Sequence, residues 1–232
     1  TPDKVYPTIS ELPLPLTNVS ISNFGRQSCG GTLEQSFVRS CNTAFASIGM
    51  DLGADALREQ AEKFGWGTSF EVPLRAATSQ FPEAPDEPQT AMSAIGQFDV
   101  TATALQMAMV GAGIGNNGQV MSPYLVSQVL SPELEVLETA EPVEFSQAMS
   151  PANAAELLAM MVTVVDQGTG SNARIPGVVV GGKTGTAQTA PGQPPHAWFV
   201  GVAPASTPGA AEVAVAVVLQ NGGGAAEISG NR

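Results

Sequence analysis

The segment "GVVVGGKTGTAQ" (177–188) contains residue types that could serve either of two chemistries. It satisfies G-x-x-x-x-G-K-[ST], the pattern of a phosphate-binding loop, with Gly177, Gly182, Lys183 and Thr184. Such a loop needs a helix that begins at the lysine, so that backbone N–H groups converge on the phosphates. Here three consecutive valines (178–180) fill the turn, and glycine and prolines follow Thr184. These residues favour a strand and then turns, so nucleotide binding is not predicted.

The second chemistry uses the lysine on a strand. In Lys183-Thr184-Gly185-Thr186, the glycine allows a ligand to approach the backbone closely. The two threonines are two positions apart and so project from the same face of a strand. The pattern predicts an ammonium and two hydroxyls available to a ligand; the alternative is a surface lysine flanked by threonines that favour strands.

Composition limits the classes of partner. The chain has 232 residues, of which 43% are hydrophobic and 13% charged, enough for one substantial core or two small ones. Its net charge of −12 argues against nucleic acid and anionic membranes as partners. No apolar run approaches the ~18 residues of a membrane span.

Two further kinds of reactive side chain are sparse. Cys29 and Cys41 are the only cysteines, too few for a zinc site; from the residues alone they are either buried thiols or one bridge. His196 is the only histidine, but it follows two prolines and no G-x-S-x-G segment exists. A Ser-His-Asp triad is therefore not predicted.

Helical patterns fill the first half of the chain. Thr32 and Gln35 form a capping box, and apolar residues follow at helical spacing to Ile48, with Gly49 or Gly53 as the end. Extended segments are expected over 1–24, a second helix over 54–64, a long loop over 66–91, and a third helix from Asp99 or Thr101 to about 113.

Strand patterns dominate the end. A β-ribbon is predicted over 124–138, followed by a helix capped by Ser150 and closed by Gly168. Three short strand-like runs then follow, over 178–188, 197–204 and 212–220, and their short links predict an antiparallel meander. The expected class is α+β, with helices packed on an antiparallel sheet.

A second motif lies upstream of the lysine. Ser40-Cys41-Asn42 matches Ser-x-Asn, which accompanies Lys-Thr-Gly in serine acyl-transfer enzymes. "GTLEQSFVRSCNTAFASIG", "SAIGQFDVTATALQMAMVGAGIGNNGQVMSPYLV", "GGKTGTAQ" and "HAWFVGVAP" occur in the family's order. Nearly the whole chain thus resembles the penicillin-binding transpeptidases, specifically the monofunctional class B enzymes, with their serine-transpeptidase/β-lactamase-like fold.

The resemblance implies roles for individual residues. Ser40 would relay a proton, Lys183 would keep the site electropositive and orient Ser40, and Asn42 would hold the amide backbone of the substrate. The hydroxyls of Thr184 and Thr186 would bind a terminal carboxylate, and the N–H of Thr186 would supply half of an oxyanion hole. Gly185, Gly96 and Gln97 are expected next to substrate. No metal or organic cofactor is implied.

One family motif is missing. The nucleophile belongs to Ser-x-x-Lys, but the residues three positions before Lys4, Lys63 and Lys183 are threonine, glutamine and valine. The resemblance therefore implies that residues 1–232 are the C-terminal portion of a single transpeptidase domain. The nucleophile helix and an N-terminal domain would precede residue 1, so that this portion alone cannot be acylated.

The resemblance also implies partners and a location. Peptidoglycan stem peptides ending in D-Ala-D-Ala would be substrates, β-lactams would acylate the same serine, and divisome or cell-wall proteins would recruit the enzyme for division and cell shape. An N-terminal segment outside this chain would anchor it on the extracytoplasmic face of the membrane. There a Cys29–Cys41 bridge would persist and tether Ser40 and Asn42, with displacement from their working position as one consequence to test.

Two alternatives to a transpeptidase remain open. A D,D-carboxypeptidase or a β-lactamase shares the motifs but uses water as the acceptor. A non-catalytic β-lactam sensor or scaffold would lack Ser-x-x-Lys altogether.

Overall fold

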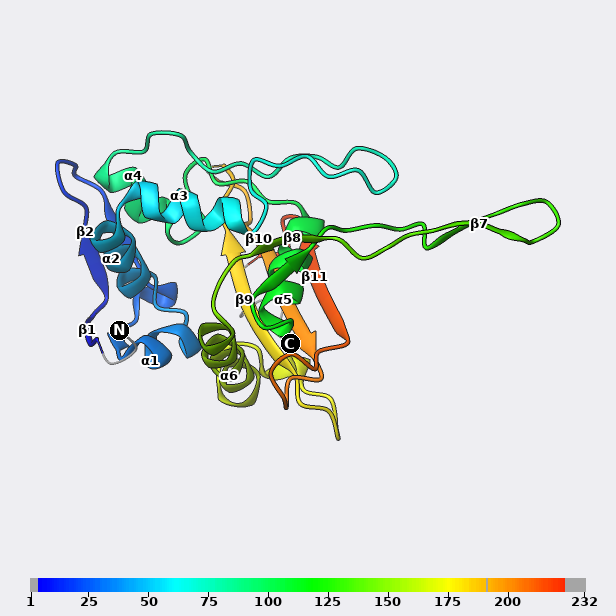
Figure 1. The fold of residues 1–232 in the computed structure, drawn as a ribbon. Helices are drawn as coiled ribbons and strands as arrows, with labels where there is room; N and C mark the ends of the chain where they lie inside the picture. The colour runs from blue at the N-terminus through cyan, green and yellow to red at the C-terminus, as the bar shows by residue number, and fades with distance from the viewer. Residues whose placement is uncertain (1–3, 191, 224–232) are drawn as a thin grey trace.

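The computed structural model describes residues 4–190 and 192–223. Its helices are α1 (Leu33–Val38), α2 (Asn42–Leu52), α3 (Ala54–Lys63), α4 (Glu87–Ser93), α5 (Ala104–Gly115) and α6 (Pro151–Gln167), with 3-10 turns η1 (Phe24–Arg26) and η2 (Ser171–Ala173). Its strands are β1 (Tyr6–Ile9), β2 (Glu11–Pro13), β3 (Ser20–Ser22), β4 (Cys29–Gly31), β5 (Gln119–Met121), β6 (Gln128–Leu130), β7 (Val136–Thr139), β8 (Glu144–Gln147), β9 (Gly181–Ala187), β10 (His196–Ala203) and β11 (Val213–Leu219). The predicted α+β class is confirmed (Figure 1).

The last three strands form an antiparallel sheet with the order β11-β10-β9, which confirms the predicted meander. Lys183 of β9 lies opposite Val200 of β10, and Val200 lies opposite Ala216 of β11. In the part of the chain that the structure describes, β9 has no strand neighbour on its outer side. The edge of β9 is therefore open to other elements.

Helices α5 and α6 pack against this sheet (Figure 1). Gly111 of α5 allows close approach, because a Cβ atom there would lie 3.0 Å from Cγ1 of Val200. The core between these layers consists of Ile114, Leu158, Met161, Val202 and Ala205. The sheet is thus backed by a packed helical layer that fixes the course of β9.

The N-terminal elements form a separate cluster beside α6 and β9 (Figure 1). Strand β1 pairs with β4 and β2 pairs with β3, in agreement with the extended segments predicted for this region. Two small cores join these strands to α2 and α4; they contain Tyr6, Cys29, Cys41 and Ala44 in one case and Leu14, Ile21, Ala46 and Ala91 in the other.

Helices α3 and α6 lie where the sequence predicts them, and Ser150 caps α6 by accepting the N–H of Asn153. The single helix predicted from Thr32 to Ile48 is wrong, because the chain breaks between α1 and α2. The cap predicted for α5 is also wrong. Thr101 bridges Gln80 in extended conformation, and Thr103 caps the helix instead.

Helix α4 lies inside the segment predicted as a loop. Asp86 and Gln89 form a capping box at its start, and Pro88 occupies its first turn, where a proline costs no backbone hydrogen bond. Between β5 and β8 the chain leaves the body of the molecule as a long hairpin that contains β6 and β7 (Figure 1, green). This hairpin includes the predicted ribbon.

Candidate active site

Lys183 is the point at which the two predicted motifs meet. Its Nζ atom donates hydrogen bonds to Oγ of Ser40 at 2.8 Å and to the backbone carbonyl of Thr184 at 2.9 Å. The ammonium also lies 5.7 Å from the centre of the Phe37 ring, within range of a cation–π interaction. The fold therefore joins residues that are 143 positions apart in the chain. Below, Lys183–Thr186 are called the strand wall and Ser40–Asn42 the turn wall.

Burial determines the electrostatics of Lys183. It lowers the pKa of the amine from 10.5 to about 8, because removal from water disfavours the charged form. Within residues 4–190 and 192–223, no carboxylate forms an ion pair with Lys183. At pH 7 most of the amine remains protonated, since its pKa is about one unit higher. The site thus holds a positive charge that a substrate carboxylate could neutralise.

The turn wall begins with a strained residue. Ser40 has a φ of 57°, in the left-handed region that is uncommon for residues other than glycine. The N–H groups of Ser40 and Cys41 return to the carbonyls of Phe37 and Ser36, at 3.1 and 2.8 Å. These bonds end α1 and place the Ser40 hydroxyl beside Lys183.

A disulfide joins Cys41 of the turn wall to Cys29 of β4, with the two Cα atoms 5.4 Å apart. Cys41 is completely buried, and Cys29 is paired through its strand with Ile9 of β1. The bridge ties the turn to a small sheet. Because Lys183 still contacts Ser40 with the bridge formed, the bridge does not displace Ser40 from the strand wall.

Asn23 organises the helix that follows the turn. Cys41 is the N-cap residue of α2 but makes no side-chain capping bond. Instead, Oδ1 of Asn23 accepts the N–H of Thr43 at 3.0 Å, and Nδ2 of Asn23 donates to the carbonyl of Ile9 at 2.8 Å. Asn42 starts α2 and donates from Nδ2 to the carbonyl of Ser22 at 3.0 Å. Since an amide has a second N–H and an acceptor oxygen, this bond uses only part of its capacity.

The hydrogen bond of Gln97 shows to which side of β9 the backbone groups of Thr186 point. Its Nε2 atom donates to the backbone carbonyl of Thr186 at 3.2 Å. In an antiparallel strand, the N–H and C=O of one residue point to the same side. The N–H of Thr186 therefore also points away from β10, toward the open edge of β9. Gly96, beside Gln97, has a φ of 71°, and a Cβ atom built there would meet no other atom within 4 Å.

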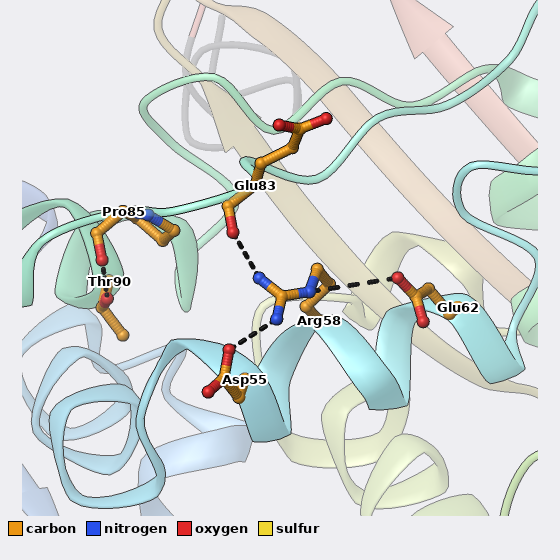
Figure 2. Close-up of polar contacts among 6 residues, drawn as sticks. All are labelled: Asp55, Arg58, Glu62, Glu83, Pro85 and Thr90. Carbon is orange, nitrogen blue, oxygen red and sulfur yellow. Dashed lines mark hydrogen bonds and ion pairs between the residues drawn. The ribbon is translucent and has the colours of Figure 1, made fainter.

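Arg58 of α3 anchors the loop that leads to Gln97 (Figure 2). Its guanidinium donates to the backbone carbonyl of Glu83 and to the carboxylate of Asp55, and it lies 4.0 Å from a carboxylate oxygen of Glu62. Thr90 of α4 donates to the carbonyl of Pro85 at 3.3 Å. These contacts fix the entry to α4, and the turn that follows α4 contains Gly96 and Gln97.

Two adjoining cavities of about 300 Å³ each border the walls. Ser40 lines one of them, together with Arg39, Asn23 and Thr169. Thr184 and Gly185 line the other, together with Thr169 and Phe199. Thr169 belongs to both, and its hydroxyl lies 2.6 Å from that of Thr184. Thr169 therefore lines both hollows and contacts the strand wall through Thr184.

Sequence patterns missed Thr169, Asn23 and Phe37 as parts of this site. Thr169 follows directly after Gly168, which closes α6, but its position gives no sign of a partner on β9. His196 lies outside the contact between the walls; its Nδ1 accepts the N–H of Asn221 at 3.0 Å. No group of three or more acidic, histidine or cysteine side chains that could hold a metal occurs in the described residues.

Comparison with known proteins gives the family. A model of the penicillin binding protein transpeptidase domain matches residues 4–231. The chain belongs to this family. The peptidoglycan D,D-transpeptidase PbpA of Mycolicibacterium smegmatis is 41% identical over 219 residues, which cover 91% of this chain and 44% of that protein. PbpA of Mycobacterium tuberculosis is also 41% identical, over 221 residues.

Solved structures agree with the sequence relatives. The imipenem acyl-enzyme complex of penicillin-binding protein A from M. tuberculosis matches with a TM-score of 0.92 and 38% identity, over 99% of this chain and 53% of that one. The expected resemblance to the penicillin-binding transpeptidases is confirmed, and relatives of the PbpA type are among the matches. The chain spans about half the length of the relatives it matches. No helix among the described residues is long and apolar enough to cross a membrane.

Proposed function

We propose that this chain supplies two of the three motifs of a serine D,D-transpeptidase that cross-links peptidoglycan stem peptides. The observation that supports this most strongly is the 2.8 Å hydrogen bond from Lys183 to Ser40. A proton relay needs its members within hydrogen-bond reach, and this bond connects the strand wall to the turn wall. The third motif, Ser-x-x-Lys, would come from a segment outside residues 1–232.

In the first half of the reaction, the serine of that segment attacks the carbonyl of the D-Ala-D-Ala bond. An ester forms at the serine oxygen, the amide C–N bond breaks, and D-alanine leaves with the proton that the serine loses. Ser40 would pass this proton to the leaving nitrogen, and Lys183 would hold Ser40 in place. The N–H of Thr186, on the open edge of β9, would bind the oxyanion.

Substrate orientation would use both walls. The carboxylate of the terminal D-alanine would lie near the hydroxyls of Thr184 and Thr186, close to the charge on Lys183. Asn42 would bind an amide of the stem peptide through the side-chain N–H that does not donate to Ser22. Gln97 and Gly96 would border the bound peptide. In the second half, an acceptor amine attacks the ester, forms the new amide and releases the serine.

The M. tuberculosis structure with imipenem is an acyl-enzyme. We infer that β-lactams, which resemble the peptide, acylate the same serine in the protein that contains this chain. The disulfide suits an oxidising compartment, which supports a location outside the cytoplasmic membrane. A membrane anchor outside this chain, divisome or cell-wall partners and a role in division belong to the same proposal.

The test uses the full-length protein that contains this chain. Fluorescent penicillin should label it, whereas residues 1–232 alone should stay unlabelled. A stem pentapeptide ending in D-Ala-D-Ala is then supplied with an acceptor amine. The proposal predicts the cross-linked product; release of free tetrapeptide alone would indicate a carboxypeptidase, and a stable adduct without turnover of peptide would indicate a sensor.

A further inference from the structure

The hairpin between β5 and β8 is the part of the molecule that the proposed reaction does not use. Residues 122–144, here called the arm, extend far from the body (Figure 1). Its two sides are joined near the base by the bond from the Ser122 N–H to the carbonyl of Val143, at 2.8 Å. Farther out they are joined by the bond from the Ala140 N–H to the carbonyl of Ser127, at 2.9 Å, and by the pairing of β6 with β7. The outer half of the arm is therefore a two-stranded ribbon, and its two sides are also joined near the base.

The base and the tip of the arm are both fixed. At the base, Phe145 of β8 packs edge-on against Phe70, with ring centres 5.3 Å apart. At the tip, Oγ of Ser131 accepts the N–H groups of Glu133 and Glu135, each at 3.2 Å. These bonds hold Leu134 in the left-handed region, with a φ of 67° and 76% of its surface exposed. The tip thus maintains backbone strain at an apolar residue that faces water.

Many apolar side chains of the arm are exposed to water. The exposed ones are Tyr124, Leu125, Val126, Val129, Leu130, Leu134, Val136, Leu137 and Val143. Val129 and Leu130 are consecutive in β6, and the pairing with β7 shifts register at this step. A lone two-stranded hairpin is marginally stable in water, and exposed apolar patches of this kind mark interaction surfaces.

The charge of the arm selects among possible partners. It carries five glutamates, Glu133, Glu135, Glu138, Glu141 and Glu144, and no lysine, arginine or histidine. An anionic membrane surface would repel it. A second copy of this chain, with a net charge of −12, would repel it as well. The complementary surface is apolar and positively charged.

We propose that the arm binds an extended segment of a partner protein in which apolar and basic residues alternate. Within the described residues, the outer edges of β6 and β7 have no strand neighbour, so such a segment can pair with the backbone at either edge. Its apolar side chains would cover Val129, Leu130 or Leu137, and its basic side chains would meet the glutamates. This surface is separate from the site around Lys183, so the inference does not depend on the proposed reaction.

The test measures binding of a synthetic peptide, acetyl-(Val-Lys)5-amide, to the full-length protein by fluorescence anisotropy. Three variants are compared with the wild type: Glu133→Gln/Glu135→Gln/Glu138→Gln on the arm, Leu134→Ser/Leu137→Ser on the arm, and Glu34→Gln/Glu59→Gln/Glu156→Gln away from it. All three glutamates of the last variant are exposed, so it removes the same charge elsewhere. Each arm variant should weaken binding about tenfold or more, and the off-arm variant less than about twofold.

Two further readouts complete the test. Hydrogen exchange should show slower exchange of arm amides with the peptide bound, and acetyl-(Ser-Lys)5-amide, with equal charge but no apolar residues, should bind about tenfold more weakly. Circular dichroism confirms that each variant folds. The proposal is overturned if the Val-Lys peptide does not bind the wild type, or binds arm and off-arm variants alike. It is also overturned if the arm variants instead abolish self-association or binding to phosphatidylglycerol vesicles.

Discussion

The strand wall and the turn wall lie within hydrogen-bond distance of each other, yet they are fixed by different means. Lys183–Thr186 take their positions from the pleat of β9 and from register with β10, which the whole three-stranded sheet supports. Ser40 and Cys41 lie in a turn with a left-handed serine between a six-residue helix and α2, and Asn42 is the first residue of α2. A disulfide and the Asn23 cap hold that turn from outside.

This difference explains why the disulfide and the Asn23 cap occur at the turn wall and not at the strand wall. A strand inside a packed sheet fixes its side chains and its outward N–H groups by geometry alone. A turn of strained residues needs other contacts to hold it in one conformation. We therefore expect changes on the strand wall to affect chemistry directly, and changes around the turn wall to affect chemistry through stability.

The largest effect is expected from Lys183→Met. It removes the cation and the donor to Ser40 while keeping a side chain of similar length. Loss of a positioned proton-transfer partner typically costs 10²–10⁴-fold, so acylation of the full-length protein by fluorescent penicillin should slow by about that factor. Lys63→Met, at an exposed lysine, is the matched control and should acylate at the wild-type rate. Normal acylation of Lys183→Met would contradict the assignment.

The turn wall is tested by Cys29→Ser/Cys41→Ser. The bridge closes a short loop, and its removal should lower the free energy of unfolding by about 3 kcal/mol, measured by urea denaturation. Acylation should also slow, because the bridge holds Cys41 in place and the position of the adjacent Ser40 depends on that of Cys41. A reductant should reproduce the loss in the wild type and have no effect on the variant. Unchanged stability would show that the turn keeps its conformation without the disulfide.

Lys183 also predicts a pH dependence of stability. Its pKa is about 8 in the folded chain and near 10.5 when unfolded, so unfolding between these values takes up a proton. The stability that Lys183 contributes is therefore present above pH 10.5 and lost as the pH falls through 8. Between pH 7 and pH 10.5, the free energy of unfolding of the wild type should rise by up to about 3 kcal/mol relative to that of Lys183→Met. Urea denaturation of both proteins at several pH values measures this, and a constant difference between them would refute it.

A smaller effect is expected at the open edge of β9. Gln97→Ala removes the hydrogen bond to the carbonyl of Thr186 and should slow acylation by less than about tenfold, in line with ~1 kcal/mol for one hydrogen bond. Gln220→Ala, at an exposed glutamine, is the control. A loss as large as that of Lys183→Met would mean that Gln97 takes part in the chemistry itself.

The same contrast shows what the sequence can predict. The strand wall was predictable in part: Lys183–Thr186 lie on the predicted strand, but β9 begins only at Gly181, after the three valines that favoured a strand from 178, and Val178 instead forms an isolated bridge with Ile175. The break in the turn wall was not predictable, because it spans about one helical turn. Phe37 before it and Phe45 after it therefore keep the spacing of one continuous helix.

Other failures have similar physical causes. The prolines of the segment 66–91 hid α4, although its capping box is visible in the sequence at Asp86 and Gln89. Thr101 was an equally good cap by type, but its pairing with Gln80 is a contact between distant residues. The role of Asn23 depends on its hydrogen bond with Thr43 of α2, which lies 20 positions later in the chain. Patterns of neighbouring residues in the sequence cannot predict such contacts between distant residues.

The central claim is that Ser40 and Lys183 act as one unit across the two walls. A double-mutant cycle on the full-length protein measures it, with the second-order rate constant of acylation by fluorescent penicillin for Ser40→Ala, Lys183→Met and the double variant. Coupled residues should give a double variant no slower than the slower single variant. If instead the two losses multiply, Ser40 and Lys183 act independently, and the 2.8 Å contact between them has no part in the reaction.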